Sequence, residues 1–233
     1  MCTVIGIQLE FEPNVKPTLL SKLTSLIEEA QIRGRQATGI AYWNGERLEC
    51  FKEAVPSPQF LEYFQLENII YDNNRISCVI HTRYATTYGS LGEPQPIVKE
   101  NVAVVLNGVI TQEPPDKWYQ LFGIEPATEN DAEIALHYYL NNKLPELPGS
   151  WSLVILEQNK IFAVRNRYRP LWGLEIDTPE LKGVVYCSTY NILQRSGWTK
   201  LGRAKRLPAL SDLIPESYKM KQVGSLEDYY GED

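Results

Sequence analysis

The stretch MCTVIGIQLEF, residues 1–11, predicts a core β-strand that begins directly after a cysteine. Every second residue from Ile5 to Phe11 is large and apolar, which is the period-2 pattern of a strand with a buried face. Cys2 then has four interpretations: a small buried hydrophobic residue, half of a disulfide, a terminal residue without a role, or a nucleophile. The last requires removal of Met1, because Cys2 would then carry a free α-amine that can act as its base.

The composition is that of an ordinary globular protein, with 233 residues of which 43% are hydrophobic and 22% charged. This length favours one large domain. The formal net charge of -6 argues against a nucleic-acid-binding surface, which needs a basic field. We find no apolar run long enough to span a bilayer and no signal peptide. The four cysteines are irregularly spaced, so we expect a reduced, cytoplasmic protein.

Metal and cofactor chemistry are not expected. The chain has only two histidines, His81 and His137, so a Ser-His-Asp triad has few candidates. A zinc site would have to combine Cys78 with His81. Residues three apart on a strand point to opposite faces, so this pair is a poor chelate.

The remaining pattern predicts strands in groups with helices between them. Helices are expected over residues 14–33, 57–66 and 128–140, and strands over residues 75–81, 102–106, 150–156, 161–165, 171–174 and 184–188. Asn44-Gly45 between apolar runs predicts a hairpin. The runs VAVVL (102–106) and SLVIL (152–156) suit strands buried on both faces. We therefore predict an α+β fold, a four-layer αββα sandwich of two stacked antiparallel sheets.

Four further stretches could carry chemistry, and each also has an ordinary structural interpretation. Arg33-Gly34 could simply end a helix, and Asn107-Gly108 could be a type I′ turn. Thr128-x-x-Asp131 fits a capping box, and Arg83 could be a surface ion-pair partner.

Taken in order, these stretches resemble the class II glutamine amidotransferase domain, a family of N-terminal-nucleophile hydrolases. The likeness is greatest to the glutaminase domain of amidophosphoribosyltransferases. It rests on RGRQATGI (33–40), HTRYATTYGSLGEPQPI (81–97), LNGVIT (106–111), TENDAEI (128–134), GSWSLVIL (149–156), IFAVRNRYRPLWGL (161–174) and, more faintly, YCSTYNILQRSGW (186–198). Leu106, Gln36, Thr38 and Thr189 depart from the family's usual residues.

The resemblance implies a role for each site residue. Cys2 would be the nucleophile, with the Asn107 side chain and the Gly108 backbone N–H as oxyanion donors. Arg83 would bind the carboxylate of free glutamine and Asp131 its ammonium group. The resemblance also places Arg33 and Gly34 at the pocket beside Cys2, and Tyr84 and Thr86 in a loop that closes over glutamine.

We therefore expect an enzyme that hydrolyses the side-chain amide of L-glutamine through a cysteine thioester. The alternatives are a catalytically silent glutamine-binding or scaffold protein, and an N-terminal-nucleophile amidase with another amide substrate. The domain is expected over residues 2–198, followed by an extension, 199–233, with a basic patch GRAKR and a Tyr229-Tyr230 pair. We expect a separate ammonia-accepting synthase as partner, with this extension as a possible contact.

Overall fold

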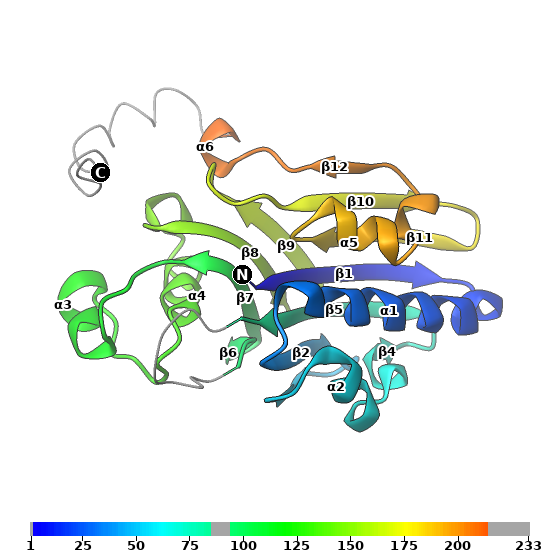
Figure 1. Ribbon diagram of the computed structural model, residues 1–233, viewed down its shortest axis with the longest axis horizontal. Helices are drawn as coiled ribbons and strands as arrows, with labels where there is room; N and C mark the ends of the chain where they lie inside the picture. Colours follow the sequence, from blue (N-terminus) through cyan, green and yellow to red (C-terminus); the bar gives the residue numbers. More distant parts are fainter. Residues whose placement is uncertain (1, 85–93, 214–233) are drawn as a thin grey trace.

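The computed structural model describes residues 2–84 and 94–213, whose strands form two antiparallel sheets (Figure 1). The larger sheet has eight strands in the order β12-β10-β11-β1-β5-β2-β3, with β4 paired to β5 beside this path. Its strands are β1 (Thr3–Phe11), β2 (Ala37–Trp43), β3 (Leu48–Glu53), β4 (Ile70–Tyr71), β5 (Arg75–Arg83), β10 (Trp172–Asp177), β11 (Leu181–Cys187) and β12 (Ala204–Arg206). The smaller sheet, in the order β6-β7-β8-β9, contains β6 (Ile97–Lys99), β7 (Val102–Val109), β8 (Ser150–Glu157) and β9 (Lys160–Arg165).

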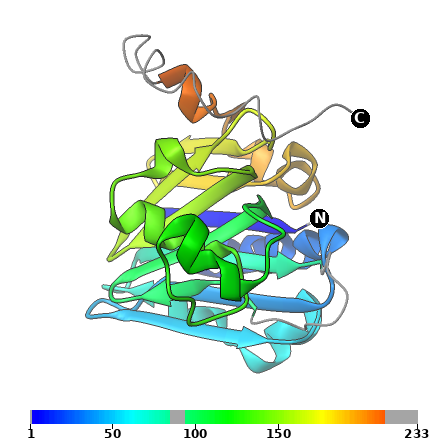
Figure 2. The same cartoon turned by 90° about the vertical axis from the view of Figure 1, so that its left-hand side faces the viewer.

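Helices cover the outer face of each sheet. α1 (Lys16–Ala30), α2 (Ser57–Tyr63) and α5 (Tyr190–Arg195) pack on the larger sheet through one apolar cluster. α3 (Trp118–Phe122) and α4 (Ala132–Leu140) pack on the smaller sheet through a second cluster, and Figure 2 turns this part of the molecule toward the viewer. A third cluster, which includes Val4, Val79 and Val154, lies between the sheets. The predicted αββα sandwich is therefore confirmed.

Strand β1 lies inside the larger sheet, where it pairs with β5 on one side and β11 on the other. Ile5, Ile7, Leu9 and Phe11 all belong to the cluster beneath the helices, as the period-2 pattern predicts. Val4 faces the other way into the cluster between the sheets. Because both faces are buried, packing fixes the position of this strand and of the cysteine that precedes it.

Two local interpretations of the sequence were wrong. Asn107 and Gly108 are not a turn but lie within β7, opposite Ser152 and Trp151 of β8. The helix predicted from residue 128 begins at Ala132 instead. Hydrogen bonds explain the late start, because the Glu133 carboxylate accepts from the backbone N–H groups of residues 127 and 128 and holds that segment as a turn.

The helix that follows β1 also ends differently from the expected glycine C-cap. α1 stops at Ala30 and a single 3-10 turn, Gln31–Arg33, follows it. Gly34 then has an extended backbone with φ of -170°. Glycine is needed at this position for a different reason, because a side chain here would collide with the backbone at the end of β5.

Two features of the remaining chain complete the description. Strand β12 and the short helix α6 (Leu210–Leu213) lie within the segment 199–233, and β12 pairs with β10 as an edge strand. None of the helices in the described residues is long and apolar enough to cross a membrane.

Candidate active site

Cys2 lies directly before β1, where the backbone of the residue that follows β5 reaches its sulfur. The backbone N–H of Tyr84 donates to Cys2 Sγ at 3.5 Å, and Sγ lies 3.7 Å from the Tyr84 carbonyl oxygen. The register explains this contact, because Thr3 pairs with Thr82 and the next residues along the two strands are Cys2 and Arg83. All four cysteines are free thiols, so the disulfide interpretation of Cys2 is wrong.

The charges around the thiol have opposite signs. Burial is the main cause that raises the pKa of the Cys2 thiol above its ordinary value. The hydrogen bond from Tyr84 and the positive charge of Arg83 act in the opposite direction, while the negative charge of Asp131 raises the pKa further. The structure therefore brings Arg83 and Asp131, from distant parts of the sequence, close enough to Cys2 to act on it electrostatically.

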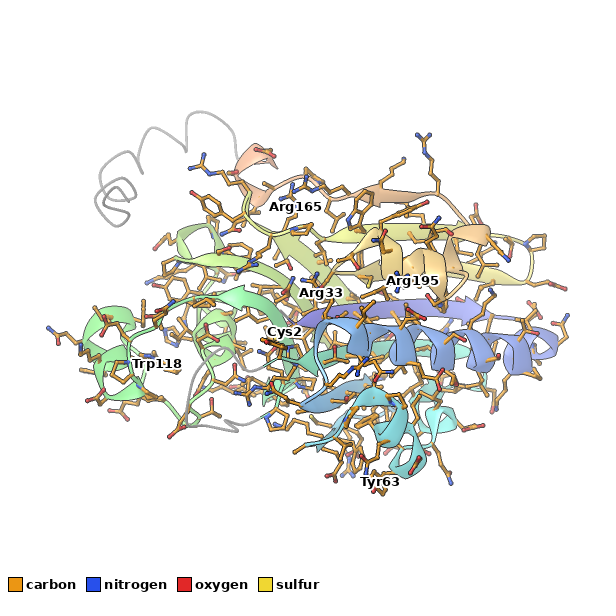
Figure 3. All side chains as sticks on the ribbon, in the orientation of Figure 1. Cys2, Arg33, Tyr63, Trp118, Arg165 and Arg195 are labelled. Carbon is orange, nitrogen blue, oxygen red and sulfur yellow. The ribbon has the colours of Figure 1, made fainter. Side chains whose placement is uncertain are left out.

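Arg33 and Gly34 hold the start of β1 from the side of α1. Arg33 Nε donates a hydrogen bond of 2.9 Å to the Cys2 carbonyl oxygen, and Figure 3 shows Arg33 beside Cys2. A Cβ on Gly34 would collide with the Arg83 carbonyl group and lie 2.7 Å from Tyr84 N. Only glycine therefore allows this segment to approach the end of β5 so closely.

Asn107 and Gly108 come from the smaller sheet. The Asn107 side chain is 1% exposed, and its Nδ2 has no hydrogen-bond partner within the described part of the chain. A buried amide donor without a partner costs free energy, so such a group indicates a site that a ligand completes. A Cβ on Gly108 would collide with the Ser150 carbonyl oxygen, so the glycine is needed for the pairing with β8.

Asp131 precedes α4, and its carboxylate faces the end of β7. Its Oδ2 accepts a hydrogen bond of 2.7 Å from the backbone N–H of Ile110. It occupies the N-cap position without a side-chain capping bond, so the capping-box interpretation is wrong. Burial raises the pKa of Asp131 to about 6, although backbone hydrogen bonds and the charge of Arg83 oppose this shift.

Gln95 and Asn130, which the sequence did not single out, connect these elements. Gln95 Oε1 accepts from the backbone N–H of Leu106 at 2.6 Å, directly before Asn107. Gln95 Nε2 donates to Asn130 Oδ1 at 3.3 Å, and Asn130 is next to Asp131. Gln95 lies in the stretch EPQPI, but nothing in the sequence alone shows that its side chain reaches β7.

A hollow of about 400 Å³ lies at Arg33 and Tyr84, the two residues that hydrogen-bond to Cys2. Its lining includes Arg33, Tyr84, Thr189 and Arg195. The Tyr84 side chain is 53% exposed at this surface. Cys2, Asn107, Gly108 and Asp131 are not among the lining residues, so the candidate nucleophile and the candidate oxyanion donors do not form this hollow.

The sequence analysis also considered His81 as a zinc ligand and placed Thr86 in a loop that closes over glutamine. His81 is buried, and burial followed by the charge of Arg83 lowers its pKa to about 3, so its imidazole is neutral at ordinary pH. Across residues 2–84 and 94–213 no group of three or more His, Cys, Asp or Glu side chains could hold a metal ion. Thr86 lies outside the described residues.

The comparisons with known proteins connect this geometry to a family. Residues 81–194 match the family model described as a glutamine amidotransferase domain. This segment contains Arg83, Asn107, Gly108 and Asp131, whereas Cys2 and Arg33 precede it. Mouse amidophosphoribosyltransferase is 29% identical, over 60% of this chain and 32% of its own.

Two solved structures are similar in fold. Glutamine phosphoribosylpyrophosphate amidotransferase from B. subtilis, in complex with ADP and GMP, has a TM-score of 0.57 and 20% identity, over 88% of this chain and 44% of its own. A structure described as the allosteric regulatory enzyme of purine biosynthesis has a TM-score of 0.61 and 19% identity, again over 88% of this chain and 44% of its own. The chain thus spans about a third of the length of the curated relative and less than half of each structural neighbour.

Proposed function

We propose that the chain, whose residues 81–194 match a glutamine amidotransferase domain, hydrolyses the side-chain amide of glutamine with Cys2 as nucleophile and supplies the ammonia to an acceptor. The observation that carries the proposal is the pair of opposite charges, Arg83 and Asp131, that both act on the Cys2 thiol. Free glutamine is a zwitterion, so a site that holds it needs one cation and one anion near the nucleophile.

In this proposal Arg83 binds the α-carboxylate and Asp131 the α-ammonium group of glutamine. An arginine guanidinium can donate two parallel hydrogen bonds to a carboxylate, which fixes its orientation. The side-chain amide then extends toward Cys2 Sγ. The amide carbonyl oxygen lies toward the unpartnered Nδ2 of Asn107 and the N–H of Gly108.

The chemistry requires that Met1 be removed, so that Cys2 has a free α-amine. The amine takes the thiol proton as sulfur attacks the amide carbon, and the proton then passes to the nitrogen that leaves as ammonia. Water attacks the resulting thioester, which releases glutamate and restores the thiol. Arg33 positions the nucleophile through the Cys2 carbonyl oxygen and takes no part in proton transfer.

Replacement of Arg83 or Asp131 by alanine should weaken glutamine binding at least about tenfold, because loss of a charge-assisted hydrogen bond costs roughly 1.5–3 kcal/mol. Calorimetric titration of glutamine into each variant measures this, and kcat/KM for glutamate release should fall in parallel. Arg75→Ala is the matched control, since Arg75 is an exposed arginine at the other end of the same strand. Normal glutamine affinity in both Arg83→Ala and Asp131→Ala would show that the charge pair does not recognise the substrate.

Glutamine binding should also weaken as the pH falls through about 6, where Asp131 becomes protonated. Only the ionised carboxylate can pair with the ammonium group. The affinity should therefore be fully present above this pH and fall by up to about tenfold per unit below it. The Cys2→Ala variant allows the titration without turnover, and adding Asp131→Asn to it should remove the pH dependence. An unchanged pH profile in the double variant would exclude Asp131 as the titrating group.

For the acceptor, we propose a separate synthase, with residues 199–233 as its contact. Aromatic and arginine side chains are common interface anchors. A pull-down from the native host followed by glutaminase assays with each recovered synthase tests this. A synthase that accelerates glutamate release supports the proposal, whereas brisk turnover that no synthase alters would indicate a free-standing glutaminase.

A further inference from the structure

A second hollow, of about 350 Å³, lies on β10, β11 and β12 at one edge of the larger sheet, and none of the candidate active-site residues lines it. This edge extends beyond the smaller sheet, whose strands β7, β8 and β9 pack mainly against β1 and β5 of the larger one. The position of Tyr186 identifies the face. A Cβ on Gly6 would approach side chains of Val154 and Ile161 in the smaller sheet and, at 3.5 Å, the Tyr186 ring. The hollow therefore begins where the packing between the sheets ends.

A glycine forms the floor of this hollow. Gly173 of β10 pairs with Tyr186 of β11 on one side and with Lys205 of β12 on the other, so these positions share one face of the sheet. A Cβ on Gly173 would lie 3.1 Å from Tyr186 Cε1 and 3.6 Å from Leu207 Cδ2. The missing side chain leaves room between the tyrosine ring and the lysine, and Tyr186 and Leu207 supply an apolar wall.

The charged groups around the hollow are mostly positive. Arg203, Lys205 and Arg206 line it, and Glu175 is the acidic residue among the lining side chains. None of the three basic side chains forms an ion pair with a described residue. This concentration of positive charge is unusual in a chain whose formal net charge is -6. Three positive charges and one negative charge leave an excess of two.

Arg165 lies behind the hollow and does not line it, so its charge is not part of this excess. Its side chain is buried and is fixed by hydrogen bonds to the carbonyl oxygens of Leu207 at 2.7 Å and Asn166 at 2.8 Å. Burial and then the positive charge of Arg206 lower the pKa of Arg165, while Asp212 acts in the opposite direction. The two arginines therefore repel each other in the free protein, and a bound anion would relieve this repulsion.

We propose that this hollow binds a small organic molecule that carries a phosphoryl group. Its phosphoryl oxygens lie against Arg203, Lys205 and Arg206, and its organic part lies against Tyr186, Leu207 and Pro208. A phosphate monoester carries about -1.5 to -2 charges at neutral pH, which matches the excess of two, whereas a carboxylate carries only one. Arginine and lysine are also the usual ligands of phosphate oxygens. This site is independent of glutamine hydrolysis.

Calorimetric titration with phenyl phosphate, inorganic phosphate and benzoate tests the proposal on the full chain. Phenyl phosphate should bind most tightly, because inorganic phosphate lacks the organic part and benzoate lacks the second charge. Arg203→Ala and Lys205→Ala should each weaken its binding at least about tenfold. Lys182→Ala is the matched control, since this exposed lysine of β11 does not line the hollow, and it should leave the affinity unchanged.

Two further variants keep the test decisive. Glu175→Gln removes the acidic lining residue and should tighten phenyl phosphate binding, a gain that damage to the fold would not produce. Cys2→Ala should bind phenyl phosphate like the unaltered chain, which separates this site from the proposed glutaminase. Absence of phenyl phosphate binding, equal binding of benzoate, or equal losses in Lys205→Ala and Lys182→Ala would overturn the proposal.

Discussion

Cys2→Ala should abolish the release of glutamate from glutamine, with a fall in kcat of roughly 10⁴-fold or more, because the attacking atom is lost. The fold should persist, since the side chain is only partly buried and precedes the first strand. A coupled assay for glutamate measures the activity, and thermal unfolding measures the stability. Cys50→Ala is the matched control, because Cys50 is the exposed free thiol on β3 and should be dispensable.

The amine of Cys2 should be as necessary as its sulfur. A residue retained before Cys2 converts the amine to an amide, which cannot accept the thiol proton. Mass spectrometry of the purified protein establishes whether Met1 has been removed, and a variant with an uncleaved N-terminal tag should be inactive. Full activity in a chain verified to carry such an extension would exclude the proposed base.

Asn107→Ala should lower kcat by about a hundredfold or more, as expected when one oxyanion donor is lost. KM for glutamine should change little, because the donor acts on charge that develops in the transition state. Nδ2 has no partner in the described chain, so its removal deletes no hydrogen bond of that nitrogen in the free protein. Steady-state kinetics separate kcat from KM, and Asn44→Ala, in the distant hairpin, serves as control. A rise in KM with normal kcat would assign Asn107 to ground-state binding instead.

The sequence motifs agree with the family model, and the predicted fold agrees with the structure. The resemblance to glutamine amidotransferases, read from ordered blocks along the chain, is confirmed by the match over residues 81–194. The αββα arrangement is confirmed by the two sheets and their helices. The fold class was accessible because period-2 and 3.6-residue patterns are local properties of the chain, whereas the family was recognised from its resemblance in ordered motif blocks. The roles of Cys2, Asn107 and Asp131 stay predictions that the variants above address.

The sequence by itself determined most of the core strands and the helix α1, and which residue types could carry acyl-transfer chemistry. Only the tertiary structure decided where those residues lie. Asn107-Gly108 has the local signature of a turn, yet pairing with Ser152 and Trp151 of β8 keeps it within a strand. Gly34 resembles a helix cap, yet its lack of a side chain is required by the backbone of β5. The contacts of Cys2 join residues 31 and 82 positions apart, and no local pattern encodes such approaches, because they depend on how the sheets and loops pack together.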